Sequence, residues 1–186
     1  TRIKPNHPKN ITSLAGLGAK APRANTAPAT SALLSSPKSC DVGIYLNSRV
    51  MLIADYGNHR IREIYDNGGT FYIRTVAGTG NPSYSTGTAV NSDLNYPTSA
   101  IYDLEGNIYI MDLRNYLIRK ITRITAGNTN NVNTDQISNY AGTQGSSGGG
   151  NNGDSNDVTG NVPVYIDEGY SLDINEQGDI YLTELS

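Results

Sequence analysis

The feature that most constrains this chain is an internal repeat. Residues 55–64 (DYGNHRIREI) and residues 112–121 (DLRNYLIRKI) are two copies of one pattern, and each follows a short apolar run. Each copy leads on to the tripeptide Ala-Gly-Thr, at residues 77–79 and 141–143, and a further Ala-Gly pair occurs at residues 15–16. Repetition on this scale indicates that the copies fold as equivalent supersecondary units, which bury their apolar faces against one another.

The repeat covers nearly the whole chain. The segment LSSP at residues 34–37 matches LNYP at residues 94–97, and a third copy of the strand pattern, QGDIYLTE at 177–184, matches EGNIYIMD at 105–112. The Gly-Asn and Gly-Asp pairs in these copies suit tight hairpin turns, where a positive φ costs Gly little. The period is roughly 60 residues and lengthens to about 70 around the Gly/Asn-rich loop 145–161.

Each unit contains four short segments typical of β-strands. In the middle copy they span about 99–103, 107–112, 116–124 and 134–141, and they are rich in Ile, Tyr, Val and Thr between Gly, Asn and Pro. No segment shows a sustained apolar period of 3.6 residues, so we expect no helix of any length.

The third strand of each unit indicates how the sheets pack. Ile61 and Ile64 fall on opposite faces of one strand, as do Ile118 and Ile121 in its copy. A sheet that has neighbours on both faces tolerates this pattern, whereas a sheet with one wet face does not. The sequence therefore predicts an all-β chain of four-stranded antiparallel sheets stacked face to face, the arrangement of blades in a β-propeller.

These residues resemble the NHL repeat. The resemblance rests on a Gly-Asn hairpin, an apolar strand that ends in Asp, the run NHRIR at residues 58–62 and the segment VAGTG at residues 76–80. The second copy, NYLIR at residues 115–119, is similar, and the last copy has Glu184 in place of the Asp. NHL domains form propellers that serve mostly as binding platforms, and a minority of related propellers are metal-dependent lyases or hydrolases. The resemblance implies the same NHL-like fold here.

We expect a single propeller segment over residues 1–186, with two whole blades and a half-blade at each end. Its expected parts are the outer strands of a shared blade plus a loop (1–37), a blade (38–80), a second blade (97–143), a Gly/Asn-rich loop (144–168) and the inner strands of a shared blade (169–186).

The two ends of the sequence suggest assembly. The sequence stops where an Asn-x-Arg-Ile-Arg strand is due, and its first residues, TRIK at 1–4, resemble that strand. Because open sheet edges pair readily with other chains, we expect head-to-tail β-strand complementation into a filament or ring. The expected interface residues are Arg2, Ile3, Ile11, Leu14, Ile180 and Leu182. Alternatively, the sequence is a fragment of a longer propeller that is a protein- or RNA-binding scaffold, or a lyase or hydrolase whose active residues lie elsewhere.

Charge and hydropathy argue against two classes of partner. A net charge of −3 and a pI near 5.3 disfavour a nucleic-acid-binding protein, which would show a basic face. Arg60, Arg62, Arg119 and Lys120 recur at equivalent places and would form a small basic patch; the simpler interpretation is that they point outward beside acidic neighbours such as Glu63. No apolar run approaches the ~18 residues that a membrane span needs.

Three features bear on location. Cys40 begins a strand, where a small buried residue serves, and the alternative is an interchain disulfide. Asn10 lies in the one Asn-x-Ser/Thr sequon with a permitted middle residue, which makes it the candidate glycosylation site. The Ser/Thr/Asn-rich loops 79–95 and 127–161 are expected to face solvent and to bear glycans. We therefore expect an extracellular or cell-surface protein.

Signals of catalysis are sparse. The chain has two histidines, His7 and His59, and the motif position of His59 on a third strand indicates a structural role. Asp154 and Asp157 resemble part of a carboxylate-rich Ca²⁺ loop but lack the spacing of an EF-hand.

The acidic residues at the strand ends also have a structural explanation. Asp55, Asp112 and Glu184 are expected to cap the adjoining turns through backbone N–H groups. The sequence thus favours a non-enzymatic structural or interaction module without a cofactor. Its expected partners are further copies of itself, the rest of a longer propeller, and glycans.

Overall fold

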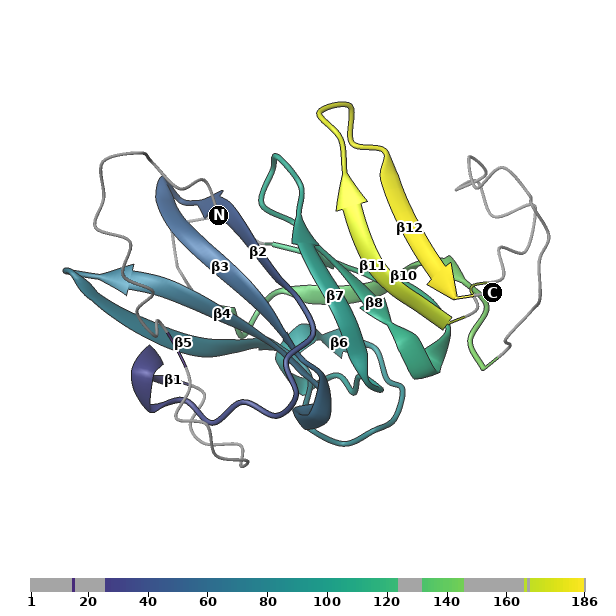
Figure 1. The fold of residues 1–186 in the computed structure, drawn as a ribbon, viewed down its shortest axis with the longest axis horizontal. Coiled ribbons are helices and arrows are strands. Elements are labelled where there is room, and N and C mark those ends of the chain that lie inside the picture. Colours follow the sequence, from purple (N-terminus) through teal and green to yellow (C-terminus); the bar gives the residue numbers. More distant parts are fainter. Residues whose placement is uncertain (1–14, 16–25, 124–131, 146–165, 167, 186) are drawn as a thin grey trace.

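The computed structural model describes residues 15, 26–123, 132–145, 166 and 168–185 (Figure 1). The first sheet has the strand order β1-β5-β4-β3-β2. Its strands are β1 (Thr26–Pro28), β2 (Cys40–Tyr45), β3 (Ser48–Asp55), β4 (Arg60–Asn67) and β5 (Thr70–Ala77).

The second sheet repeats this order as β6-β10-β9-β8-β7, and a hairpin of two strands follows it. The strands are β6 (Gly87–Thr88), β7 (Pro97–Tyr102), β8 (Ile108–Asp112), β9 (Leu117–Thr122) and β10 (Gln136–Gly142), then β11 (Glu168–Ile174) and β12 (Ile180–Leu185) in the hairpin. The short 3₁₀ helices are η1 (Ala29–Ser31), η2 (Tyr56–Asn58), η3 (Ala89–Asn91) and η4 (Leu113–Asn115).

The prediction of an all-β chain is confirmed for the described residues, which contain no α-helix. Four consecutive strands form an antiparallel meander in each sheet, as the sequence predicts. A fifth strand, β1 or β6, pairs with the outermost strand of each meander. The expectation of four strands was wrong on this point because β1 and β6 are only three and two residues long, too short to show a strand pattern in the sequence.

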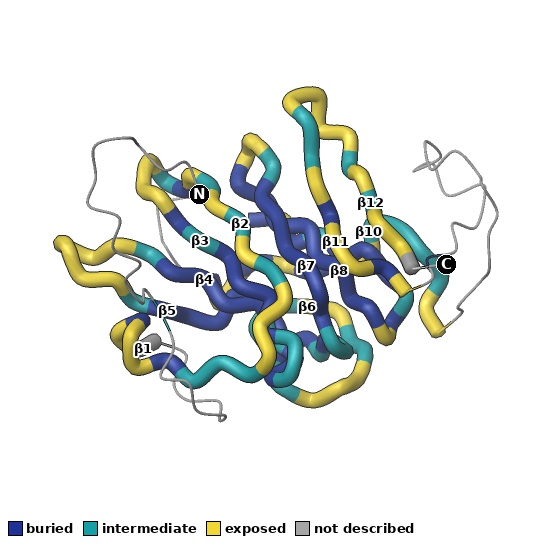
Figure 2. Tube along the Cα trace, viewed as in Figure 1, coloured by how far each residue is buried: buried dark blue, intermediate teal, exposed yellow. Residues whose placement is uncertain are grey.

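Both faces of each sheet are covered by apolar contacts. Ile61 lies in a core between the two sheets, and Ile64 lies in a cluster on the other face of the first sheet. Likewise Ile121 joins the core between the sheets, while Ile118 packs toward the hairpin. Figure 2 shows these buried layers running through β3, β4, β7 and β8. Among the described residues, the predicted stacking on both faces is therefore present for the second sheet, whereas the first sheet has a neighbouring sheet on one face only.

The first strands of successive units lie side by side. Strand β2 packs beside β7, and β7 packs beside β11, so the three units fan out from these strands (Figure 1). Hydrogen bonds join these neighbouring strands, and two of them have a backbone N–H as donor. The backbone N–H of Tyr102 donates to Oδ2 of Asp41 (2.9 Å), and the N–H of Leu172 donates to Oγ of Ser99 (3.1 Å).

The repeat extends to the backbone torsions. His59 after η2 and Tyr116 after η4 are both left-handed, with φ of 53° and 58°. Gly78 and Gly142 face these turns with φ of 96° and 97°, and a Cβ on either would lie 2.3 Å from the carbonyl oxygen of His59 or Tyr116. Gly78 and Gly142 are therefore needed both for the torsion and for the close approach of the two backbone segments.

Candidate functional site

A buried group of three polar side chains, Asp, Asn and Arg, lies at the end of β3 in the first sheet and of β8 in the second. We call this group the lock. In the first sheet, Oδ1 of Asp55 accepts the backbone N–H of Ser35 (2.7 Å), and Oδ2 accepts Nδ2 of Asn58 (2.9 Å) and lies 3.8 Å from the guanidinium of Arg62. These contacts join the loop before β2, the turn at η2 and strand β4, so the lock fixes the path of the chain into the sheet.

The second sheet contains the same lock. Asp112 accepts the backbone N–H of Asn95 (2.7 Å), Nδ2 of Asn115 (2.8 Å) and the guanidinium of Arg119 (3.2 Å). The expectation that these aspartates cap the adjoining turn was wrong, because the backbone N–H groups that they bind lie in the loop before the sheet. The sequence spacing Asp-x-x-Asn-x-x-x-Arg identifies the lock once it is read as a unit.

The basic side chains of the repeat do not form a surface patch. Arg62 and Arg119 are 1% and 0% exposed, because each points inward to its aspartate. Arg60 bonds the carbonyl oxygens of Asn58 and Thr79. The simpler interpretation, that these strand residues point outward, was also wrong for the two buried arginines. Neither of them presents its charge to a nucleic acid.

Glu63 is the centre of a charge cluster buried between the two sheets. Its carboxylate accepts Nε of Arg74 (2.7 Å), the hydroxyl of Tyr102 (2.7 Å) and the guanidinium of Arg123. Arg123 also lies 3.3 Å from Asp135 and stacks on the ring of Tyr45. Two carboxylates thus face two guanidinium groups, and the cluster is electrically balanced.

Burial and charge act in opposite directions on these carboxyl groups. Burial raises the pKa of Glu63, but Arg123 and then Arg74 outweigh it and hold that pKa below its usual value. Burial dominates at Asp112, where it raises the pKa to about 6 although Asn115, Asn95 and Arg119 oppose it. Burial likewise raises the pKa of Asp55. The carboxyl groups of Asp55 and Asp112 in the two locks therefore bind a proton more readily than the carboxyl group of Glu63 does.

His59 has a structural role in this arrangement. It lies at the left-handed position before β4, rather than within the strand, and is buried. Its Nδ1 accepts the backbone N–H of Tyr96 (3.1 Å), and its ring packs edge-on against the ring of Tyr96. Burial, and then the charge of Arg60, lower the pKa of His59. The imidazole is therefore neutral and links the first sheet to the loop before the second.

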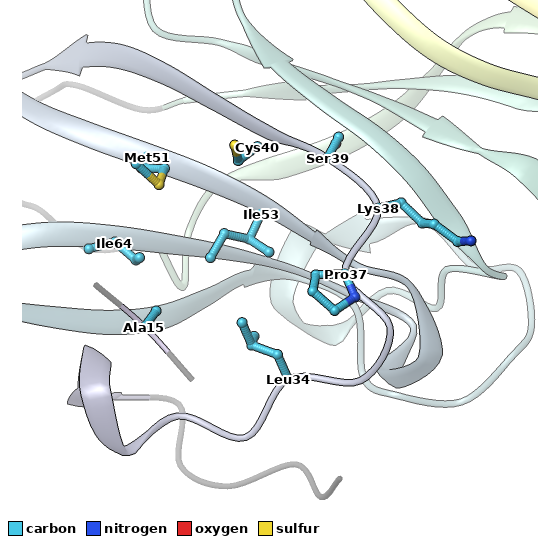
Figure 3. A pocket seen from close by; sticks show the side chains of 9 residues that line it. All are labelled: Ala15, Leu34, Pro37, Lys38, Ser39, Cys40, Met51, Ile53 and Ile64. Atoms are coloured by element: carbon cyan, nitrogen blue, oxygen red, sulfur yellow. The ribbon is translucent and has the colours of Figure 1, made fainter. Parts of the chain in front are cut away.

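The first sheet has an apolar outer face, turned away from the second sheet. We define this outer face by Cys40 and Val42 of β2, Met51 and Ile53 of β3, and Ile64 of β4, which the strand register places on one side. A cavity of about 400 Å³ lies on it, and Figure 3 shows Met51, Ile53 and Ile64 lining this cavity. Cys40 was expected to be buried but is exposed there. Val42 is 61% exposed, an unusual position for an apolar strand residue.

The hairpin also has two different faces. Ile180 and Leu182, expected at an assembly interface, pack with Leu172 and Ile174 against the second sheet of the same chain. Their side chains are therefore covered within the chain, and the opposite face is the one available to a partner. We define this hairpin outer face by Ser171 and Asp173 of β11 and Tyr181 and Thr183 of β12, all of which are exposed (Figure 2).

A polar groove of about 680 Å³ lies between strand β2 and the turns of the second sheet and the hairpin. It is lined by residues of β2, the β7–β8 turn and the β11–β12 turn, among them Asp41, Asp103, Glu105 and Asp173. Lys120 is the cation in its lining. In the described part of the chain, no group of three or more His, Cys, Asp or Glu side chains is arranged to hold a metal ion.

Several predicted residues lie outside the described residues: Arg2, Ile3, His7, Asn10, Ile11, Leu14, Asp154 and Asp157. Part of the loop 79–95, expected to face solvent, instead contributes Ala89 and Leu94 to the core between the sheets. None of the helices in the described part is long and apolar enough to cross a membrane.

Comparison of the sequence with protein-family models finds no match. A search of characterised proteins also finds none. The class that the observed fold defines is an all-β protein built from repeated antiparallel sheets.

Proposed function

We propose that this chain is a non-enzymatic building block of the NHL-like propeller type, which assembles head to tail by β-strand complementation. In this arrangement residues 1–16 of one copy supply the outer strands of a blade, and the β11–β12 hairpin of another copy supplies the inner strands. The products are a filament, or a ring if the rotation between copies closes. The proposal includes an extracellular location.

The observation that carries the proposal is the position of Ala15. The Ala-Gly pairs that begin at residues 77 and 141 lie at the ends of β5 and β10, and a third such pair begins at residue 15. Ala77 packs between the first and second sheets, and Ala141 packs between the second sheet and the hairpin. Ala15 packs on the outer face of the first sheet, beside Leu34 and Met51 (Figure 3). This position of Ala15 supports the proposal, because the last strand of a preceding blade would pass over the same face.

The hairpin supports the same proposal. Its register matches that of the β2–β3 and β7–β8 pairs. Its bulge at Gly169/Ser171 repeats the bulge at Pro97/Ser99 in the β7–β8 pair. Within the described residues β12 has one pairing partner, β11, whereas its equivalents β3 and β8 have two each. A second pairing partner for β12, supplied by another copy, would bond the backbone N–H and C=O groups along its outer edge.

Deletion of residues 1–16 tests the proposal. The truncated protein should lose ordered assembly, measured by sedimentation velocity and electron microscopy. A synthetic peptide of residues 1–16 should bind the truncated protein, because it supplies the strands that complete the shared blade. A scrambled peptide of the same composition is the control. Ordered assembly of the truncated protein in the absence of peptide would contradict strand complementation.

Peptide mapping tests the proposed location. Native material should carry carbohydrate on Asn10 or on the Ser/Thr-rich loops if the protein is secreted. Unmodified peptides throughout native material would remove the support for an extracellular location.

A further inference from the structure

The chain contains two contacts between successive units, one between the two sheets and one between the second sheet and the hairpin. Together they show which groups a contact of the same kind between two copies would need. At the first contact, Asp41 of the first sheet accepts the backbone N–H of Tyr102 in the second sheet. At the second contact, Ser99 of the second sheet accepts the backbone N–H of Leu172 in the hairpin. In both cases a side chain on the first strand of one unit binds the backbone of the first strand of the next.

The strand registers align these positions across the three units. Pairs Cys40–Ile53, Ala100–Ile110 and Leu172–Leu182 are equivalent, and each is followed by the equivalent pairs Val42–Met51, Tyr102–Ile108 and Ile174–Ile180. It follows that Ser171 of the hairpin corresponds to Ser99, and Asp173 corresponds to Asp41. The hairpin outer face thus carries both of the acceptors that the internal contacts use, and both are exposed.

The outer face of the first sheet is the complementary half. Its Cys40 and Val42 correspond to Leu172 and Tyr102, whose N–H groups donate at the internal contacts. Tyr102 is buried by its neighbour, whereas Val42 is 61% exposed. An apolar strand face that is covered in two units and open in the third is a contact surface for the same kind of neighbour.

We propose that the hairpin outer face of a second copy docks on the outer face of the first sheet, with Asp173 accepting the N–H of Val42 and Ser171 accepting the N–H of Cys40. This inference rests on the proposed head-to-tail assembly and adds to it the contacting faces and their register. The copies then continue the internal stack without a change of geometry from one chain to the next.

The native Cys40 provides a direct test of the register. It is the one cysteine of the sequence, so Ser171→Cys introduces a single possible partner for it. Within one chain β7 lies between β2 and β11 (Figure 1), and residues 40 and 171 belong to the two outer faces, which are turned away from the second sheet, so a bond between them joins two copies. Oxidation of Ser171→Cys should give a ladder of covalent oligomers on a non-reducing gel, and mass spectrometry should find the peptide that joins residues 40 and 171.

Two variants serve as controls for this crosslink. Asn67→Cys places an equally exposed cysteine on the distant β4–β5 turn and should give no comparable ladder. Ser171→Cys combined with Cys40→Ser should remove the ladder. Alkylation of the unassembled protein should modify Cys40 readily; protection of Cys40 there would show that its own chain covers the face and would overturn the inference.

A charge reversal tests the same contact without a crosslink. Asp173→Lys should weaken assembly at least tenfold in concentration, because it replaces the acceptor with a cation. Glu176→Lys, the same charge change at an exposed position of the adjoining turn, should leave assembly unchanged. Assembly that persists without the 40–171 bond and with Asp173→Lys would refute this docking and leave head-to-tail assembly standing. Absence of assembly in the unmodified protein would refute both.

Discussion

Replacement of Glu63 by Gln tests whether the buried charge cluster holds the two sheets together. Gln keeps the size of the side chain but removes the charge that balances Arg74 and Arg123, and its NH₂ group places donors against guanidinium donors. Removal of one partner from a buried ion pair costs about 3–5 kcal/mol. Asp135 still compensates Arg123 at 3.3 Å, so we expect a loss of about 3 kcal/mol in the free energy of unfolding, the lower end of that range.

Urea unfolding measures this loss. The chain has 13 tyrosines and no tryptophan, so tyrosine fluorescence with far-UV circular dichroism is the suitable signal. With a slope of about 2 kcal/mol per molar urea, the midpoint should fall by about 1.5 M. Lys120→Gln is the matched control, because Lys120 occupies the equivalent place in the second sheet and is only half-buried over the ring of Tyr109. It should cost about 1 kcal/mol or less. Equal losses in the two variants would refute the argument.

Three further substitutions test the repeated turns and locks. Asp112 has a pKa of about 6 in the fold and 3.8 outside it, so the folded state binds its proton more tightly and the contribution of Asp112 to stability should fall as pH rises between these values. Asp112→Asn should reduce the slope of the urea midpoints with pH, and the raised pKa of Asp55 should keep part of it. Gly78→Ala should lower the free energy of unfolding by at least 2 kcal/mol more than Gly69→Ala, roughly the cost of overpacking. Both glycines have positive φ, but only at position 78 would the added Cβ lie 2.3 Å from a carbonyl oxygen. His59→Phe should cost about 1–2 kcal/mol by thermal or urea unfolding, since the N–H of Tyr96 then loses its acceptor.

The repeat was sufficient to predict the meander and the presence of apolar residues on both faces of a sheet. Spacing alone placed Ile61 and Ile64 on opposite faces, because side chains alternate along a strand regardless of what they contact. The same reasoning failed for Arg62 and Arg119. A charged residue in a strand is normally assigned to solvent, and only the recurring Asp and Asn at fixed spacing indicate that a buried partner is present.

The contacts between units were beyond sequence reasoning. Glu63 meets Tyr102 and Arg123 across separations of 39 and 60 residues, and no local pattern marks such a meeting. The exposure of Cys40 was missed for a related reason. Its strand position is equivalent to the buried Leu172, and burial there depends on which unit has a neighbour. The sequence periodicity describes one unit, whereas these properties belong to pairs of units.

The Glu63 cluster determines which unit packs against the first sheet, although the units have similar folds. The Asp–Asn–Arg locks occur in both sheets and lie within a unit, so they cannot distinguish one neighbour from another. The Glu63 cluster, in contrast, needs the hydroxyl of Tyr102 and the guanidinium of Arg123 from the second sheet. The hairpin has Ile174 at the position of Tyr102, so stacking it on this face would bury Glu63 without that donor. The buried charge of Glu63 therefore makes the second sheet the favoured neighbour of the first, although the units are otherwise similar.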